Sequence, residues 1–153
     1  MEPTYELQLA ALNALRASTA LTAMVGAKIY DRVPEKQVNG QLVPDVVSPY
    51  ISFGPVTSLP DEADDSDCID SEEITFQIDV WSWGSGLAYG SVQCRQISGL
   101  VKKALHKADL QLTTHALVSI RHVLTRILRD SDGITNHGVI QFTALVESNR
   151  TST

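Results

Sequence analysis

The chain has 153 residues, of which 43% are hydrophobic and 20% charged, the balance of one ordinary globular domain with room for a core. No apolar run approaches the length that spans a bilayer, and residues 1–9 lack the pattern of a secretory signal, so neither feature is expected. The net charge of −6 is concentrated in one acidic segment, and a general basic footprint for nucleic acid is absent.

The first residues predict a helix that begins near Pro3. Tyr5, Leu9 and Leu12 fall on one stripe at helical spacing, and Thr4 is the expected N-cap. The helix is therefore expected to bury this stripe against the rest of the protein.

The next segments are short. Residues 19–25 predict a second helix, and residues 28–33 predict a strand. Residues 35–49 contain an Asn-Gly pair and two prolines, which indicates a loop or a minor hairpin. Residues 50–54 predict another strand.

Residues 73–83 form the clearest predicted strand, because their side chains alternate between two faces. The apolar face holds Ile74, Phe76, Ile78 and Val80, and the opposite face holds Gln77, Asp79, Trp81 and Trp83.

Residues 85–107 predict the main helix. Its apolar stripe is made by Gly90, Cys94, Ile97, Val101 and Leu105. Cys94 is therefore expected to lie in the core. Both cysteines, Cys68 included, are expected to be free thiols, because two cysteines make no disulfide framework.

Two long strands, residues 117–129 and 138–147, complete the chain. Together the elements predict an α+β fold with a mostly antiparallel sheet of four to five strands. The N-terminal helix and one long central helix are expected to pack on one face of this sheet. We expect a single domain over residues 1–148 and a flexible polar tail over residues 149–153.

An acidic segment interrupts this pattern at residues 60–73, which hold eight acidic residues and no basic one. A divalent-cation site is one interpretation, but no EF-hand register fits, and the default is a solvated loop.

Two further features suggest contacts with other molecules. Trp81 and Trp83 fall on a nominally exposed face, which suggests burial against a partner, unless the N-terminal helix or residues 35–49 cover them. Arg121, Arg126 and Arg129 make the fourth predicted strand, residues 117–129, basic, which suits contact with phosphate or with acids of a neighbouring subunit. His122 between them alternates with apolar residues, as a core or interface histidine does.

Signals for chemistry are weak. The glycines of residues 84–90 loosely echo a dinucleotide-binding loop, but the rest of that motif is missing and a flexible turn is expected. No histidine pair has zinc-ligand spacing, and no serine-nucleophile elbow is present. We therefore assign no catalytic residue, cofactor or metal, and do not expect an enzyme.

The order of short blocks along the chain resembles the phage tail-completion, or tail-terminator, family. The blocks are Ala-Leu-Asn-Ala-Leu-Arg at 11–16, Ala-Leu-Thr-Ala-Met-Val-Gly at 20–26, Ile-Tyr-Asp-Arg-Val-Pro at 29–34, Pro-Tyr-Ile-Ser-Phe-Gly at 49–54, Ile-Asp-Val-Trp-Ser at 78–82, Leu-Val at 117–118, Arg-Asp-Ser-Asp-Gly at 129–133 and His-Gly-Val-Ile-Gln-Phe at 137–142. Residues 35–48 and 60–73 depart from the family in looking longer than typical.

The resemblance implies a structural virion protein, made in the bacterial host cytoplasm and placed in the neck of the particle. Such proteins form rings with copies of themselves, typically six-fold. The ring caps the tail tube protein, ends tail growth and offers a surface to the head-side connector, while DNA passes through without being read. The alternative is another connector or adaptor protein of the same neck region.

Clustered carboxylates repel phosphate, which suits a channel that must release DNA. We therefore expect the acidic segment to face the channel or a neighbouring ring, with a merely solubilising loop as the alternative. Its candidate contact residues are Asp61, Glu62, Asp64, Asp65, Asp67 and Asp70.

Overall fold

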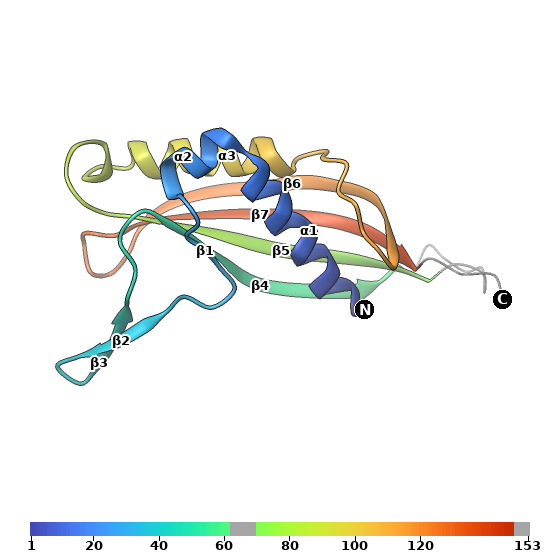
Figure 1. Ribbon diagram of the computed structural model, residues 1–153, viewed down its shortest axis with the longest axis horizontal. Coiled ribbons are helices and arrows are strands. Elements are labelled where there is room, and N and C mark those ends of the chain that lie inside the picture. The colour runs from blue at the N-terminus through green and yellow to red at the C-terminus, as the bar shows by residue number, and fades with distance from the viewer. Residues whose placement is uncertain (62–69, 149–153) are drawn as a thin grey trace.

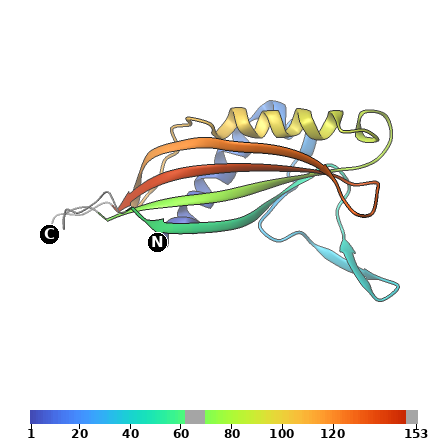
Figure 2. The same ribbon diagram turned by 180° about the vertical axis from the view of Figure 1, so that it is seen from behind.

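A five-stranded sheet forms the body of the computed structural model, which describes residues 1–61 and 70–148. The strand order is β1-β4-β5-β7-β6. These strands are β1 (Ile29–Tyr30), β4 (Tyr50–Pro60), β5 (Ser71–Ser82), β6 (His115–Arg129) and β7 (Asn136–Ser148). The helices lie on one face (Figure 1), and Figure 2, seen from behind, shows the strands with no helix in front of them.

The predicted α+β class and the count of up to five strands agree with the structure, but the sheet is mixed, with a parallel pair that the prediction of a mostly antiparallel sheet did not include. Strand β1 runs parallel to β4, whereas β4–β5, β5–β7 and β7–β6 are antiparallel pairs. A parallel pair needs a crossover connection, and residues 31–49 supply it. The alternation pattern of one strand carries no information about the direction of its neighbour.

The strands are longer than predicted around the acidic segment. Strand β4 runs on to Pro60 and β5 begins at Ser71, so only the middle of that segment separates them. Glu72 accepts a hydrogen bond from the Ser58 hydroxyl at 2.6 Å across the pair, which helps acidic residues to continue the ladder. Composition alone suggested a loop there.

Helices α1 (Pro3–Ala17) and α2 (Thr19–Val25) lead the chain. The α2 prediction is confirmed, but α1 is capped by Glu2 and not by Thr4. The Glu2 carboxylate accepts hydrogen bonds from the backbone N–H groups of Thr4 and Tyr5 at 3.0 and 2.8 Å. A negative acceptor at this position also suits the helix dipole.

The buried stripe of α1 differs from the predicted one. Leu7, Ala10, Ala11 and Leu15 are buried, whereas Tyr5 is 53% exposed. Leu9 and Leu12 are only partly buried, so they flank the buried stripe instead of making it.

The main helix, α3 (Val92–Leu105), begins later than predicted. A 3₁₀ turn, η1 (Gly86–Ala88), precedes it, and Gly84 and Gly86 adopt positive φ angles of 141° and 63°. These left-handed conformations cannot continue into an α-helix, which shortens it. The predicted apolar stripe is confirmed from Cys94 to Leu105, and Gly90 lies outside the helix.

One glycine sets the distance between α3 and the sheet. A Cβ atom at Gly138 of β7 would lie 2.5 Å from the Ser98 hydroxyl and 3.2 Å from the Cys94 sulfur. Only a residue without a side chain allows this approach. The core therefore closes around Cys94, which is fully buried, and burial raises the pKa of its thiol to about 11.

A small hairpin projects from the end of the sheet at which β4 begins and β5 ends (Figure 1). It consists of β2 (Glu35–Val38) and β3 (Gln41–Pro44), paired antiparallel. Asn39 and Gly40 form its turn, both with positive φ, as expected for a two-residue hairpin loop. The minor hairpin predicted within residues 35–49 is thus confirmed.

Candidate interaction surface

The sheet face that the helices leave uncovered is the candidate functional surface, called here the open face. Strands β5 and β7 pair directly, so their outward side chains meet as Thr75–Thr143, Gln77–Gln141, Asp79–Val139 and Trp81–His137. The threonine hydroxyls lie 3.1 Å apart, and Gln141 donates to Gln77 at 3.3 Å. The centre of the open face is therefore a polar ladder with few free groups.

Asp79 organises one end of this ladder. Its Oδ1 atom accepts hydrogen bonds from Gln77 Nε2 at 2.8 Å and from His137 Nε2 at 2.7 Å. Gly54 on β4 makes room for the carboxylate, because a Cβ atom there would lie 2.5 Å from Asp79 Oδ2. A buried carboxylate is tolerated here because its oxygen is paired.

His137 in turn supports Trp81. The two rings stack with centroids 3.9 Å apart and an interplanar angle of 12°. Trp81 Nε1 donates to the Ser52 hydroxyl at 2.9 Å, which fixes the indole from its other side. The tryptophan is therefore held in one orientation by the sheet itself.

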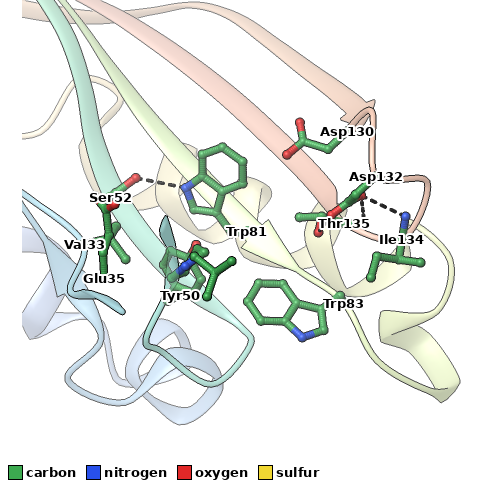
Figure 3. Close-up of a pocket in the computed structure, with 12 residues that line it drawn as sticks. Val33, Glu35, Tyr50, Ser52, Trp81, Trp83, Asp130, Asp132, Ile134 and Thr135 are labelled. Atoms are coloured by element: carbon green, nitrogen blue, oxygen red, sulfur yellow. Dashed lines mark hydrogen bonds between the residues drawn. The ribbon is translucent and has the colours of Figure 1, made fainter. Parts of the chain in front are cut away.

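A groove of about 550 Å³ opens beside this ring, between the β2–β3 hairpin and the β6–β7 turn (Figure 3). Its aromatic residues are Tyr50, Trp81 and Trp83, and Tyr50 packs between the two indoles at centroid distances of 6.3 and 5.8 Å. The backbone N–H of Trp83 donates to the Ser48 hydroxyl at 2.8 Å. Val33, Val43 and Ile134 complete the apolar lining.

The charged residues of the groove are all acidic. Glu35, Asp130 and Asp132 line it, and none of the described lining residues is lysine or arginine. Burial raises the pKa of Tyr50 to about 12, and the negative charge of Asp130 adds to this rise. Asp132 is already engaged in its turn, where it accepts from the backbone of Ile134 and Thr135 at 2.9 Å. Glu35 and Asp130 also line the cavity, and Asp130 Oδ1 lies 3.9 Å from His137 Nδ1.

The sequence-predicted aromatic pair is brought together here. Trp81 and Trp83 are both half-buried and both line the groove. Helix α1 lies on the helix side of the sheet (Figure 1), and residues of the hairpin line the groove beside the two rings. Of the two covers considered from the sequence, the N-terminal helix is therefore excluded, and residues 35–49 form one wall of the groove.

The predicted basic strand divides between the two faces. Arg121 pairs with Thr143 and Arg126 with Val139, which places both on the open face, whereas Arg129 pairs with Asn136 on the helix face. A β-bulge between His122 and Leu124 shifts the alternation by one residue. Leu124, expected on the face of His122, points the other way for this reason.

His122 itself lies on the helix side of the sheet edge. Its ring packs edge-on against Phe142 at 5.8 Å, and its backbone N–H donates to His106 Nδ1 at 3.0 Å. Burial lowers the pKa of His122, and the nearby charge of Lys102 adds to the effect. The structure thus separates His122 from Arg121 and Arg126, with which the sequence had grouped it.

Of the acidic candidates, Asp61 and Asp70 lie at the far end of the sheet from the groove. Asp61 follows β4, and its backbone N–H donates to Ser71 at 3.1 Å, while the backbone oxygen of Asp70 accepts from Ser148 at 2.9 Å. Glu62, Asp64, Asp65 and Asp67 lie outside the described residues, as does the tail at 149–153.

Within residues 1–61 and 70–148, no cluster of three or more His, Cys, Asp or Glu side chains is arranged to hold a metal ion. The helices of this part of the chain are all too short or too polar to cross a membrane.

Several residues of the groove and its surroundings had no sequence signal. Glu35 lies far from Asp130 and His137 in the chain, and only the strand register and the turn bring these residues near the tryptophans. The alternation of β5 did place Asp79 beside Trp81 on one face, but not the histidine that links them.

Comparisons with known proteins agree with these observations. The family model described as tail completion protein gp17 matches residues 10–147. The tail completion protein gp17 of Bacillus phage SPP1 is 31% identical over 101 residues, which are 66% of this chain and 69% of that protein. A chain in a structure described as the virion of a native gene transfer agent particle has a TM-score of 0.75 at 26% identity, covering 93% of this chain and 95% of that chain. The protein belongs to the tail completion protein gp17 family.

Proposed function

We propose that this protein is a structural component of a phage or phage-like virion that assembles as a ring, six-fold in our proposal, on the end of the tail tube. The ring stops tube growth and presents a surface to the head-side connector, and DNA passes through it without being read. Family membership and the likeness to a chain of a gene transfer agent virion support a place in the particle.

The observation that carries the ring is the open face of the sheet. One face is packed under helices, whereas Figure 2 shows no helix in front of the other face, which carries the polar ladder and borders the aromatic groove. Strand β6 adds a second unmet surface, since it pairs with β7 alone and leaves the other edge of its 15 residues free among the described strands. An exposed edge of this length is a site for association.

A closed ring needs a heterologous interface, in which one patch meets a different patch on the next copy. The groove lies between the hairpin and the β6–β7 turn, whereas the edge of β6 that pairs with no described strand runs along one side of the sheet. Two different surfaces satisfy that requirement.

Electron microscopy of the purified protein, alone and with isolated tail tubes, tests this function. We expect rings seated on one end of each tube. When the protein is missing during particle assembly, tails should have irregular length and should not be joined to heads. Tubes that stay bare, or correctly terminated and joined tails in its absence, would refute the proposal. Binding to the head-side connector without binding to tubes would favour another adaptor role in the neck.

The acidic segment has a proposed place in the same ring. We propose that the carboxylates of residues 60–73, among them Asp61 and Asp70, line the channel or contact the neighbouring ring, because clustered negative charge repels DNA phosphate. Replacing its acids by Asn and Gln should slow DNA passage or weaken ring stacking, as measured by infectivity and by counting capped tubes. Unchanged values for both would leave it a solubilising loop.

A further inference from the structure

We propose that the aromatic groove recognises an arginine of a second copy of this chain, presented by the open face of its edge strand β6. This proposal rests on the ring function proposed above and names the contact that closes the ring. Arg126 is the first candidate and Arg121 the second.

The chemistry of the groove suits a guanidinium group. Tyr50, Trp81 and Trp83 offer aromatic faces and edges, and Glu35 and Asp130 offer carboxylates within one cavity. An arginine stacks its flat cation on an indole and can bind a carboxylate with two parallel hydrogen bonds. The cavity combines aromatic rings with carboxylates and has no lysine or arginine among its described lining residues. It is therefore complementary to an arginine side chain.

The groove is held ready for a ligand. His137 stacks on one side of Trp81 and Ser52 bonds its indole nitrogen, so the ring has little freedom to collapse into the cavity. Tyr50 is only 3% exposed and is packed between the indoles. Aromatic side chains that are already fixed in place lose little conformational entropy on binding, which favours recognition of a single side chain.

The edge strand supplies the matching cations. Arg121 and Arg126 are exposed on the open face, and neither forms an ion pair with another described residue of its own chain. In contrast, Lys36 pairs with Asp45 at 3.5 Å on the hairpin. The charged lining residues of the groove are all acidic, so the groove complements these two arginines when another copy presents them.

The decisive experiment exchanges the charges. A groove variant carries Glu35→Lys with Asp130→Lys, and a strand variant carries Arg121→Glu with Arg126→Glu. Alone, each places like charges in every interface of the ring, so each should cap tail tubes at least about tenfold less than the wild type. Mixed one to one, the two variants should restore capping, because alternating copies pair opposite charges at every interface of an even-numbered ring.

Intrinsic fluorescence gives a second readout. The chain has two tryptophans, and both line the groove, so their emission reports on this site. Assembly of the wild type, or of the mixture, should shift the tryptophan emission to shorter wavelength, because water leaves the two indole side chains. Neither variant alone should show this shift.

Matched controls separate charge from damage. Lys102→Glu with Lys103→Glu makes the same charge change as the strand variant, but on exposed positions of α3, away from the open face, and should leave capping unchanged. Near-ultraviolet circular dichroism checks that each variant keeps its aromatic packing. If the lysines disturb the groove, the neutral pair Glu35→Gln with Asp130→Asn takes their place and should weaken capping and flatten its salt dependence.

The outcomes distinguish the two proposals. Wild-type protein that caps no tubes overturns the ring function and this contact with it. Wild-type rings together with full capping by either folded variant alone, or with no recovery in the mixture of folded variants, overturn the arginine contact and leave the ring function standing. Recovery in the mixture supports both.

Discussion

Replacing Glu6 by alanine should lower the free energy of unfolding by more than an ordinary surface substitution does. Glu6 is 3% exposed, and its carboxylate ties α1 to the beginning of β6. It accepts hydrogen bonds from Thr113 Oγ1 at 3.0 Å, from the backbone and hydroxyl of Thr114 at 2.5 and 2.6 Å, and from His115 Nδ1 at 2.6 Å. These partners are more than 100 positions away in the chain, so the contact is purely tertiary.

The magnitude follows from what the change leaves behind. A hydrogen bond to a charged group contributes about 1.5–3 kcal/mol, but bonds to one carboxylate are lost together and do not add. The His115 side chain is 15% exposed, so water can replace part of the lost contact. We expect Glu6→Ala to lower the free energy of unfolding by about 3 kcal/mol. For a chain of this length, that corresponds to a fall in Tm of roughly 6–12 °C.

Urea unfolding at neutral pH measures this loss, with the slope m unchanged if only stability is affected. Glu73→Ala is the matched control, because Glu73 is exposed and its carboxylate has no hydrogen bond to another described residue, and it should change stability by less than about 0.5 kcal/mol. A loss below about 1 kcal/mol for Glu6→Ala, or equal losses for both variants, would refute the reasoning.

The same carboxylate makes a pH prediction. Burial by itself would raise the pKa of Glu6, but the hydrogen bonds from Thr114, His115 and Thr113 outweigh it and hold the pKa far below the ordinary value of 4.5. A depressed carboxyl pKa stabilises the folded state above the unfolded pKa, and this stability is lost as the pH falls below about 4.5. Stability measured from pH 6 down to pH 3 should therefore fall less steeply in Glu6→Gln than in the wild type, and equal slopes would contradict this assignment.

Two further predictions concern the contact between α3 and the sheet. Gly138→Ala should cost about 1–3 kcal/mol, because its methyl group would collide with the Ser98 hydroxyl. In contrast, Gly99→Ala on the exposed side of α3, where nothing lies within 4 Å, should stabilise by roughly 0.5–1 kcal/mol, so the two changes should move Tm in opposite directions. Burial raises the pKa of Cys94 to about 11, so iodoacetamide at pH 8 should label this thiol only after denaturant is added. Peptide mapping measures the labelling. Labelling of the folded protein at a similar rate would show that the core is open there.

Local pattern was sufficient where one element explains itself. The helix of residues 19–25, the alternation of β5 and the buried stripe from Cys94 to Leu105 were all correctly predicted, since spacing and a capping residue determine them. The same alternation placed Asp79 and Trp81 on one face, which is half of the candidate surface. The pattern failed in two places: the bulge after His122 reversed the face of Leu124, and the buried stripe of α1 runs through Leu7 and Leu15 instead of Tyr5 and Leu12.

What the amino-acid order determined by itself was thus the elements, the burial of Cys94 and the resemblance to a tail-completion family. The tertiary structure alone decided the mixed sheet, the binding of Glu6 to a segment more than 100 residues away, and the groove that joins Glu35 and Asp130 to the tryptophans. The physical reason is that periodicity records which side of an element meets the core. The partner that a side chain meets depends on strand order, register and turns, which no single segment encodes.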